Sequence, residues 1–423
     1  MQAGKNEAQG KSTLQEITSG IDCFLFMPSQ LFPPPLPPAT RANALQQLQA
    51  FARRAHRYGR ERNFVVADHV NVSRLSAAIQ HRLISQNEVM EVVLQHHPLG
   101  SVEKFVQEVL WRSYWKGWLE MRPSVWHSYL DEAARGTDAK IERAEQIATG
   151  HSGCAVMDDF ARELIETGYL HNHARMWWAS FWIHQQKLPW ALGAKHFMNH
   201  LLDADAASNT LSWRWVAGLH TPGKTYLVRR DNIEHYHHAP GVAGMEMLEH
   251  TKAAEIRDSA LAPLLPYHAL PSNCPPDDKR TALLLHAEDL SVETTELSHL
   301  RPEIVAFYRH DEESSSSPRH EWRNMAFADA NRRAEAHFGR AVASLSSVAN
   351  IVAWLIEHRI ERLVMMQPMV GPLRDALTAL PDSLSNKGIQ LLCLRREEDN
   401  RFFPHATSGF FTFWKKASRR LTA

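Results

Sequence analysis

Three charged side chains stand inside strongly apolar and aromatic segments of the chain. Arg175 lies in the segment GYLHNHARM (168–176), and Asp203 and Asp205 lie in LLDADAASN (201–209). A charge in such surroundings is normally paired, because an unpaired buried charge is strongly destabilising. Two interpretations are open from the spacing: a structural Arg–Asp pair that holds helices together, or the polar lining of a site for a ring-shaped ligand with polar edges.

Tryptophan is the second unusual feature. The chain has 13 tryptophans, and ten of them fall between Trp111 and Trp215. A buried indole needs a partner for its N–H, so this density indicates either an aromatic core or a site that stacks a flat ligand or nucleic-acid bases.

Composition excludes several classes of protein. Lys plus Arg is 47 and Asp plus Glu is 47, so the chain is not a polycation that coats nucleic acid or membrane, although a local basic patch remains open. No pair of cysteines has the spacing of a zinc ribbon or redox motif, and His235, His237 and His238 match no standard zinc spacing, so we expect no metal. No apolar run could span a bilayer and no signal peptide is recognisable, so we expect a cytoplasmic protein without a membrane partner.

The elements that position these residues are predicted from composition and periodicity. Residues 1–40 are polar and then proline-rich, and we expect them to be disordered. Residues 41–258 carry i, i+3, i+4 apolar spacing and predict one all-helical domain, and residues 259–279 are a proline-rich linker. Residues 280–423 alternate short apolar runs with helical patterns, which predicts a doubly wound parallel sheet. The predicted strands are Thr281–His286, Ile304–Tyr308, Arg362–Met366 and Gln390–Leu394, and the helices between them are Trp322–His337, Val348–His358 and Pro372–Leu380.

Several ordered motifs of the helical part resemble the FAD-binding domain of the photolyase/cryptochrome family. The resemblance covers roughly residues 30–240, and so many motifs in the right order are far more specific than any single one. The motifs are Tyr58 with Arg62-Asn63-Phe64, Val72-Ser73-Arg74-Leu75-Ser76, Glu108-Val109-Leu110-Trp111-Arg112, GYLHNHARM, LLDADAASN and Ser212–Gly218.

The resemblance implies a U-shaped FAD among the helices. It assigns the hydroxyl groups of Ser73 and Ser76 and the guanidinium group of Arg112 to the pyrophosphate, near a helix that begins about Ser73. It places Arg175, paired with Asp203, beside the flavin ring. Asn209 would face flavin N5, which favours a repair-type flavin. The implied cofactor-binding residues are Tyr58, Ser73, Leu75, Ser76, Arg112, Asn172, Arg175, Asp203, Asp205 and Asn209.

The resemblance also implies a substrate and a reaction. Light-excited reduced FAD would donate an electron to a cyclobutane pyrimidine dimer in ultraviolet-damaged DNA, and the dimer ring would split. Trp111 and Trp215 would clamp the extruded dimer, Glu108 would hydrogen-bond its base edge, and Asn172 and Met176 would lie against it. Asn172, where (6-4)-repairing relatives usually carry a histidine, favours cyclobutane dimers. His173 and Phe105 depart from the family pattern and leave (6-4) repair open as an alternative.

Trp213 and Trp190 match the inner members of the family's electron-transfer chain, and Trp177, Trp178 and Trp182 are candidates for the outer member. Residues 41–82 carry eight arginines against Glu61 and Asp68. They form either a solvated helix face or a phosphate-contacting rim around the cofactor site.

The order of the two parts is unusual for the family, in which an α/β antenna domain normally precedes the helical domain. Glu288-Asp289-Leu290 and the stretch Phe402–Trp414 resemble parts of that domain, so we predict a circular permutation. A second, antenna chromophore stays open as an alternative, although no recognisable residue of the sequence supports one. We expect a monomeric photolyase-like lyase, and a cryptochrome-type photoreceptor without repair activity is the alternative.

Overall fold

Helices occupy the first part of the chain, as the apolar spacing predicts. The computed structural model describes residues 39–135, 138–220, 224–238, 240–256, 262–310 and 317–421. The disorder expected for residues 1–40 concerns a segment that, up to residue 38, lies outside the described residues, whereas Thr40 caps α1. The helices of this part are α1 (Arg41–Ala52), α2 (Tyr58–Glu61), α3 (Ser76–Gln80), α4 (Gln86–His96), α5 (Leu99–Glu120), α6 (Ser124–Ala134), α7 (Asp138–Ala148), α8 (Ala155–Thr167), α9 (Asn172–Ser180), α10 (Trp190–His200), α11 (Ala206–Val216) and α12 (Arg230–Tyr236).

Local sequence sets where these helices begin and end. Ser85 and Glu88 form a capping box at the start of α4, in which each side chain accepts a hydrogen bond from the other residue's backbone N–H. Gly168 ends α8 with a backbone φ of 65°, a left-handed conformation that costs glycine little. The sharp end of α8 turns the chain into α9, the helix that carries Arg175.

The second part is built on a five-stranded parallel sheet in the order β3-β2-β1-β4-β5. The four strands predicted from the sequence are confirmed with their bounds unchanged. The fifth, β3, was missed. The strands are β1 (Thr281–His286), β2 (Ile304–Tyr308), β3 (Val342–Leu345), β4 (Arg362–Met366) and β5 (Gln390–Leu394), and the helices are α13 (Pro318–Phe338), α14 (Val348–Glu357), α15 (Pro372–Ala376), α16 (Leu380–Ser385), α17 (Glu397–Phe402) and α18 (Phe410–Ala417).

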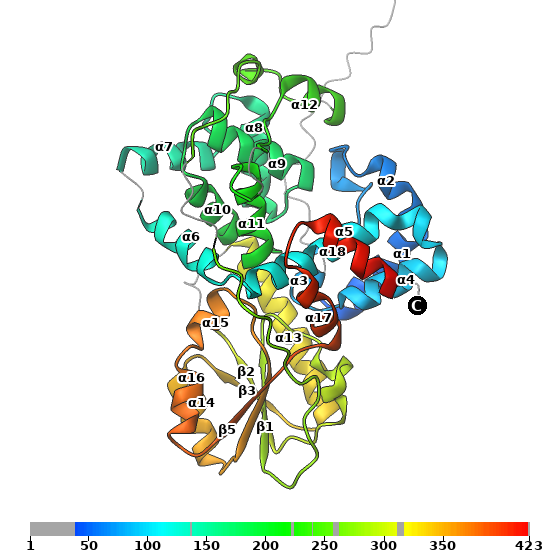
Figure 1. Ribbon diagram of the computed structural model, residues 1–423, viewed down its shortest axis with the longest axis vertical. Helices are drawn as coiled ribbons and strands as arrows, with labels where there is room; N and C mark the ends of the chain where they lie inside the picture. Colours follow the sequence, from blue (N-terminus) through cyan, green and yellow to red (C-terminus); the bar gives the residue numbers. More distant parts are fainter. Residues whose placement is uncertain are drawn as a thin grey trace, which may run out of the picture. The chain divides into compact units, whose positions relative to one another are not determined.

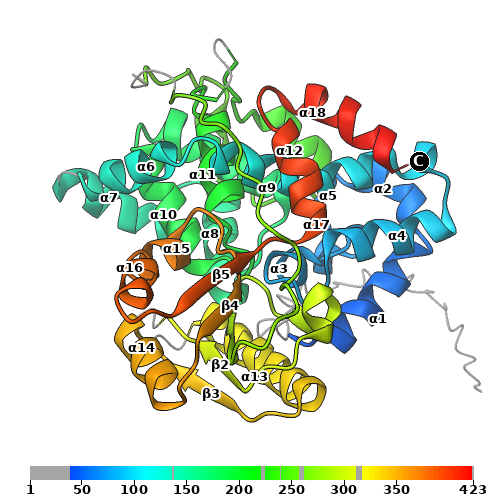
Figure 2. The ribbon, with the colours of Figure 1, turned by 60° about the horizontal axis from the view of Figure 1, so that its bottom comes forward.

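Both faces of the sheet are covered, which explains why its central strands read as continuous apolar runs. Successive side chains of a strand point to opposite faces. Ala282 and Leu284 of β1 pack with α14, α15 and α16, whereas Leu283 and Leu285 pack with α13. Figure 2 shows α13 and α14 at the sheet. The predicted fold class, a helical region followed by a doubly wound parallel sheet, is therefore confirmed.

The chain returns to the helical region after β5. Both α17 and α18, together with the 3₁₀ turn Phe403–His405 between them, contact α5. Figure 1 shows these two helices, in red, beside α5 and near α4. Residues Pro35–Ala423 form one compact unit. The boundaries at 41–258, 259–279 and 280–423 stay a prediction, as does the permutation.

Gly117 permits the close approach between α5 and the returning chain. A Cβ atom added at Gly117 would lie 2.7 Å from the backbone Cα of Phe403, whereas one added at Gly100 of the same helix would meet nothing within 4 Å. We expect Gly117→Ala to lower the free energy of unfolding by about 1–3 kcal/mol, because the backbone of Phe403 must shift. Gly100→Ala is the matched control and should leave stability unchanged or raise it by up to about 1 kcal/mol. Urea unfolding measures both, and equal stabilities for the two variants would contradict the packing argument.

A buried network of charges joins the loop before α4 to the loop that follows β1 and to the start of α17. Arg82 pairs with Asp289, at 3.2 Å, and with Asp399. Arg396 holds Asp289 with two hydrogen bonds, of 2.8 and 2.6 Å. Burial alone would raise the pKa of Asp289, but Arg396 and Arg82 outweigh it and hold that pKa well below the usual range. The residues of this network come from distant parts of the sequence. They hold the helical part against the carboxyl ends of the sheet strands.

Candidate functional site

The Arg–Asp pair expected from the sequence is present, and a second arginine joins it. Arg175 donates to Asp203 through both terminal nitrogens, at 3.0 and 3.2 Å, and Arg112 of α5 lies 3.6 Å from the same carboxylate. Asp203 stands in the loop between α10 and α11 and is buried. Burial alone would raise the pKa of Asp203, but Arg175 and Arg112 outweigh it and hold that pKa below its usual value. Asp203 is therefore an ionised group shared by two guanidinium groups.

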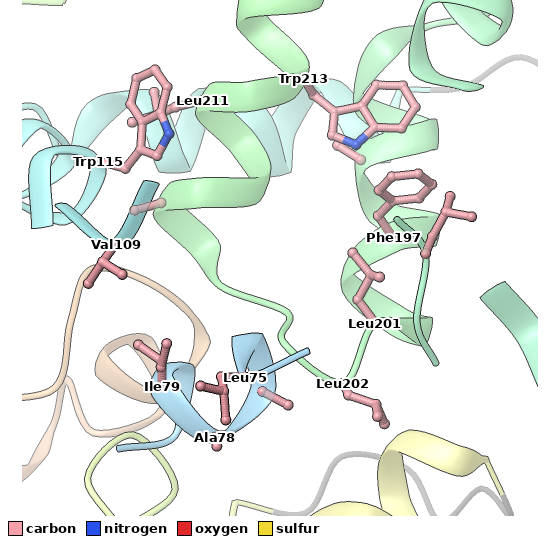
Figure 3. Packing of buried hydrophobic residues seen from close by; sticks show 14 of the residues in the cluster. Leu75, Ala78, Ile79, Val109, Trp115, Phe197, Leu201, Leu202, Leu211 and Trp213 are labelled. Carbon is pink, nitrogen blue, oxygen red and sulfur yellow. The ribbon is translucent and has the colours of Figure 1, made fainter. Parts of the chain in front are cut away.

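The serine segment before α3 reaches the same carboxylate. Ser76, the first residue of α3, forms a side-chain hydrogen bond with Asp203. Leu75 is buried, and the Ser73 hydroxyl accepts from the Leu75 N–H at 3.4 Å. The helix thus begins three residues later than the predicted Ser73. Figure 3 shows apolar side chains of α3, α5, α10 and α11 gathered around the loop between Leu202 and α11.

Asp205 and Asn209 both lie at the start of α11. Asp205 caps that helix by accepting from the Ser208 N–H at 2.6 Å, and it pairs with Lys116 at 3.3 Å. Asn209 is buried and donates from Nδ2 to the Ala194 carbonyl at 2.8 Å. Because the amide nitrogen is held by that carbonyl, Oδ1 is the atom left to accept from a ligand N–H. Lys116 was not selected from the sequence, where it is one lysine in a helical pattern.

Tyr58 is packed among aromatic rings and lies near Glu108. Its ring meets Phe51 and Phe105 edge-on, with centroids 6.1 and 5.2 Å apart. Burial and the nearby Glu108 raise the pKa of the Tyr58 hydroxyl, so it stays protonated. Glu108 itself is paired with Arg62, and burial raises the pKa of its carboxyl despite that arginine.

One face of Trp111 is covered by an aromatic ring from the end of the chain. Phe410 stacks on Trp111 with ring centroids 3.8 Å apart and an interplanar angle of 8°. Tyr114 fixes this arrangement by donating from its hydroxyl to the Ser408 carbonyl at 2.7 Å. Phe410 lies about three hundred residues from Trp111, so no local pattern in the sequence could reveal the contact. A base could stack only on the face of Trp111 that Phe410 leaves open.

The other residues proposed for the substrate lie on α9 and α11. Asn172 is the first residue of α9 and is exposed, and Met176 is half-buried one turn later. Trp215 of α11 packs on Tyr226 with ring centroids 5.8 Å apart. α11 packs against α5, so Trp215 and Trp111 come from neighbouring helices.

The eight arginines of residues 41–82 do not form one face. Arg41, Arg62 and Arg82 are tied to the carboxylates of Glu88, Glu108 and Asp289, and Arg74 lies over the ring of Tyr169. The exposed members are Arg53, Arg54, Arg57 and Arg60. The basic surface is therefore about half as large as the sequence suggested, because three of the other arginines neutralise buried or half-buried acids and Arg74 packs on an aromatic ring.

Each of the two expected electron-transfer residues, Trp213 and Trp190, is in contact with a further group of aromatic rings. Trp178 and Trp182 meet Trp213 edge-on, at 6.2 and 6.5 Å, and both are fully buried. Trp190 contacts Tyr129 at 5.7 Å, and Tyr129 contacts Trp126 at 5.2 Å. The Trp126 N–H donates to Asp375 at 2.8 Å, which brings this second group to a partly exposed carboxylate. The outer member of the chain stays a prediction.

Two histidines, His171 and His69, form a buried pair near Arg175. His171 and His69 stack at 5.7 Å, and His69 contacts Glu163 at 2.6 Å through Nε2. Burial and the nearby His69 lower the pKa of His171 to about 3, so it is neutral. Among the described residues no group of three or more His, Cys, Asp or Glu side chains could hold a metal ion. None of the described helices is long and apolar enough to cross a membrane.

A small cavity of about 60 Å³ opens where β1 and β2 end, between His81, Glu288, Arg309 and Pro372. Ligand pockets for drug-sized molecules are about 300–1,000 Å³. The cavity adds no support for a bound antenna chromophore.

Comparison with known proteins agrees with the geometry of the helical region. Residues 105–237 match the family described as the FAD binding domain of DNA photolyase. Residues 105–237 are therefore similar to a photolyase FAD-binding domain, in agreement with the resemblance carried by the motifs of the sequence. They contain Glu108, Arg112, Arg175, Asp203 and Asn209, whereas the serine segment lies before the match.

Curated relatives match part of the chain. The deoxyribodipyrimidine photo-lyase of Streptomyces griseus is 35% identical over 151 residues, 35% of this chain and 32% of the relative. That of Salmonella typhimurium is 28% identical over 209 residues, 47% of this chain and 43% of the relative. A solved class III photolyase from Agrobacterium tumefaciens is 26% identical with a TM-score of 0.41, over 47% of this chain and 42% of that chain. The chain thus spans less than half the length of these relatives.

Proposed function

We propose that the protein is a blue-light-driven, FAD-dependent DNA repair enzyme that splits cyclobutane pyrimidine dimers. The observation that carries this proposal is the ionised Asp203, which holds Arg175 and Arg112 in place within a photolyase-type helical region. A purely structural ion pair would need one arginine, whereas two guanidinium groups beside a hydroxyl and a buried amide are suited to a ligand with phosphates and a polar ring edge.

The described residues fit FAD. Ser76 and Arg112 would hold the pyrophosphate, together with Ser73 and Tyr58 from the neighbouring segments. Arg175 would stay oriented by Asp203 beside the flavin ring, and the Asn209 Oδ1 would accept from the ring N–H. Leu75, Asn172 and Asp205 complete the proposed binding residues. Bound FAD would supply a light-excited electron donor, and the protein would keep it dry and oriented.

The lesion would be held mainly by stacking and one hydrogen bond. Trp111 offers the face not covered by Phe410, and Trp215 stands on the neighbouring helix. Burial raises the pKa of the Glu108 carboxyl group, which would form the hydrogen bond to the edge of a base. Met176 and Asn172 would contact the dimer, and Trp213 and Trp190 would pass electrons toward the flavin.

Ultraviolet-damaged DNA is accordingly the proposed partner, and we propose a monomer that acts in the cytoplasm. The parallel sheet that follows the helices is proposed to be the permuted antenna domain. The small cavity at the strand ends gives no support for a bound antenna chromophore.

Spectra and a repair assay test this function together with one substitution. We expect purified protein to be yellow or blue and to restore dimer-containing oligonucleotides under blue light. Glu108→Ala should leave the flavin spectrum unchanged and weaken dimer binding or repair about tenfold, the effect of losing one hydrogen bond to a partly charged group. Glu108→Gln, which keeps a hydrogen-bonding side chain of the same length, should lose less.

Other outcomes would point elsewhere. A colourless protein that takes up no added FAD would contradict the proposal. Photoreduction without repair would favour a cryptochrome-type photoreceptor. Repair confined to (6-4) lesions would contradict the substrate assignment.

A further inference from the structure

The exposed side of α18 has an unusual composition. Its buried side carries Phe410, Phe413 and Ala417, which pack toward α5. On the exposed side, Phe411 is 73% exposed, the largest exposure among the large apolar side chains of the described residues. Lys415 and Lys416 follow one turn later and are also exposed.

This end of the chain is strongly basic in an otherwise neutral protein. Residues 400–423 carry five Arg or Lys and no Asp or Glu, whereas the whole chain has a formal net charge of zero. The five are Arg401, Lys415, Lys416, Arg419 and Arg420. Of these, Arg401 is paired with Glu397. Lys415 and Lys416 are exposed and adjacent on α18, and such neighbouring cations attract polyanions, most strongly at low salt.

The basic helix stands directly beside the proposed lesion site. Phe410 stacks on Trp111 at 3.8 Å, and the Phe411 ring lies 5.8 Å from the ring of Phe410. Two ring-to-ring contacts therefore separate Phe411 from the indole that we propose for the lesion. Successive bases of a duplex are stacked about 3.4 Å apart, so Phe411 lies within a few base steps of that indole.

We propose that α18 is a DNA-contacting helix of this protein. Lys415 and Lys416, with Arg420 one turn further on, contact phosphates beside the lesion, and Phe411 enters the base stack where the lesion has left it. Apolar side chains are used as such wedges by proteins that open or bend a duplex. This inference rests on the proposed function, because it takes Trp111 as the lesion-contacting residue.

An anionic membrane is the other surface that a basic amphipathic helix can bind. Such binding requires the apolar face of the helix to enter the lipid. In α18 that face is already buried against the protein, and Phe411 is the one apolar aromatic side chain that remains exposed. The arrangement therefore favours DNA.

Binding in the dark to a fluorescent duplex with one cyclobutane dimer, and to its undamaged twin, tests the proposal. A plot of log affinity against log salt concentration has a negative slope. In the double variant Lys415→Gln/Lys416→Gln we expect this slope to become less steep by roughly 1–2, about 0.9 for each lost phosphate contact. Lys140→Gln/Lys387→Gln removes the same charge at two exposed sites elsewhere and should keep the wild-type slope. Phe411→Ala should keep the slope but lose about tenfold in affinity for the damaged duplex alone.

The outcomes separate the inference from the function on which it rests. If wild-type protein prefers damaged DNA and the α18 variants bind with its slope and affinity, the inference is wrong and the proposed function stands. If wild-type protein does not distinguish the two duplexes, the proposed function fails first. Binding to phosphatidylserine vesicles that the double lysine variant loses would assign α18 to membranes and overturn the proposal. All the substituted side chains are exposed, and unchanged melting temperatures should confirm intact folding.

Discussion

Asp203→Asn is expected to abolish FAD retention, so that the variant is purified colourless and binds added FAD at least about a hundredfold more weakly. Asp203 accepts from both terminal nitrogens of Arg175 and lies within 3.6 Å of Arg112. An asparagine has one carbonyl oxygen and no charge, so it cannot hold two guanidinium groups in the same positions. A loss of about 2.7 kcal/mol of binding free energy corresponds to the expected hundredfold change.

The measurement is FAD titration followed by the quenching of flavin fluorescence, with circular dichroism to show that the helices remain. Asp131→Asn is the matched control, because Asp131 forms an exposed pair with Arg135, and it should bind FAD as the wild type does. Wild-type affinity in Asp203→Asn would show that the ion pair only ties helices together, which is the structural interpretation left open by the sequence.

The pH dependence of the same group has a definite sign. The folded protein holds the pKa of Asp203 below the value of about 3.9 found in unfolded chains. The stabilisation is therefore complete above the unfolded pKa and is lost as pH falls below about 4 toward the folded pKa. FAD release between pH 5 and 7 must therefore have another cause.

Elements with a strong local signal were predictable from the sequence. β1, β2, β4 and β5 are apolar runs bounded by polar residues, so each strand could be inferred directly. β1, β2 and β4 are buried almost throughout, whereas β5 is an edge strand that still has an apolar sequence. β3 has only four residues, forms an edge of the sheet and is half-exposed along most of its length, so it lacks that signal. Arg175 and Asp203 were found because a charge in an apolar helix requires a partner, which is a constraint that the sequence itself displays.

The parts that could not be predicted depend on long-range contacts. Nothing near Trp111 indicates that Phe410 covers it, and nothing near Lys116 indicates that it meets Asp205. The arginines of residues 41–82 looked alike in the sequence, yet their partners differ. Arg82 is buried with Asp289 and Asp399, whereas Arg57 is exposed. The sequence shows that the arginines are clustered, but it does not show which of them are exposed for binding and which are buried in ion pairs.

Arg82→Met is expected to lower the free energy of unfolding by about 3–5 kcal/mol, the usual effect of removing one partner of a buried ion pair. Asp399 is 1% exposed and would lose the guanidinium group that neutralises it, and Asp289 would keep Arg396 alone. Arg82 has a left-handed backbone, with φ at 52°. Methionine is strained equally there, so the loss reports the charge and not the conformation. Because the free energy of unfolding of a protein is usually about 5–15 kcal/mol, the expected loss is a large fraction of the total stability.

Urea unfolding of four variants separates charge from packing. Arg57→Met is the control at an exposed arginine and should change stability by less than about 0.5 kcal/mol. Asp399→Leu alone should be destabilising, whereas Arg82→Met/Asp399→Leu should be more stable than the sum of the single losses, because no unpaired charge then remains buried. Strict additivity would mean that Arg82 and Asp399 act independently, and the ion network would then not be what holds the helical part against the carboxyl ends of the sheet strands.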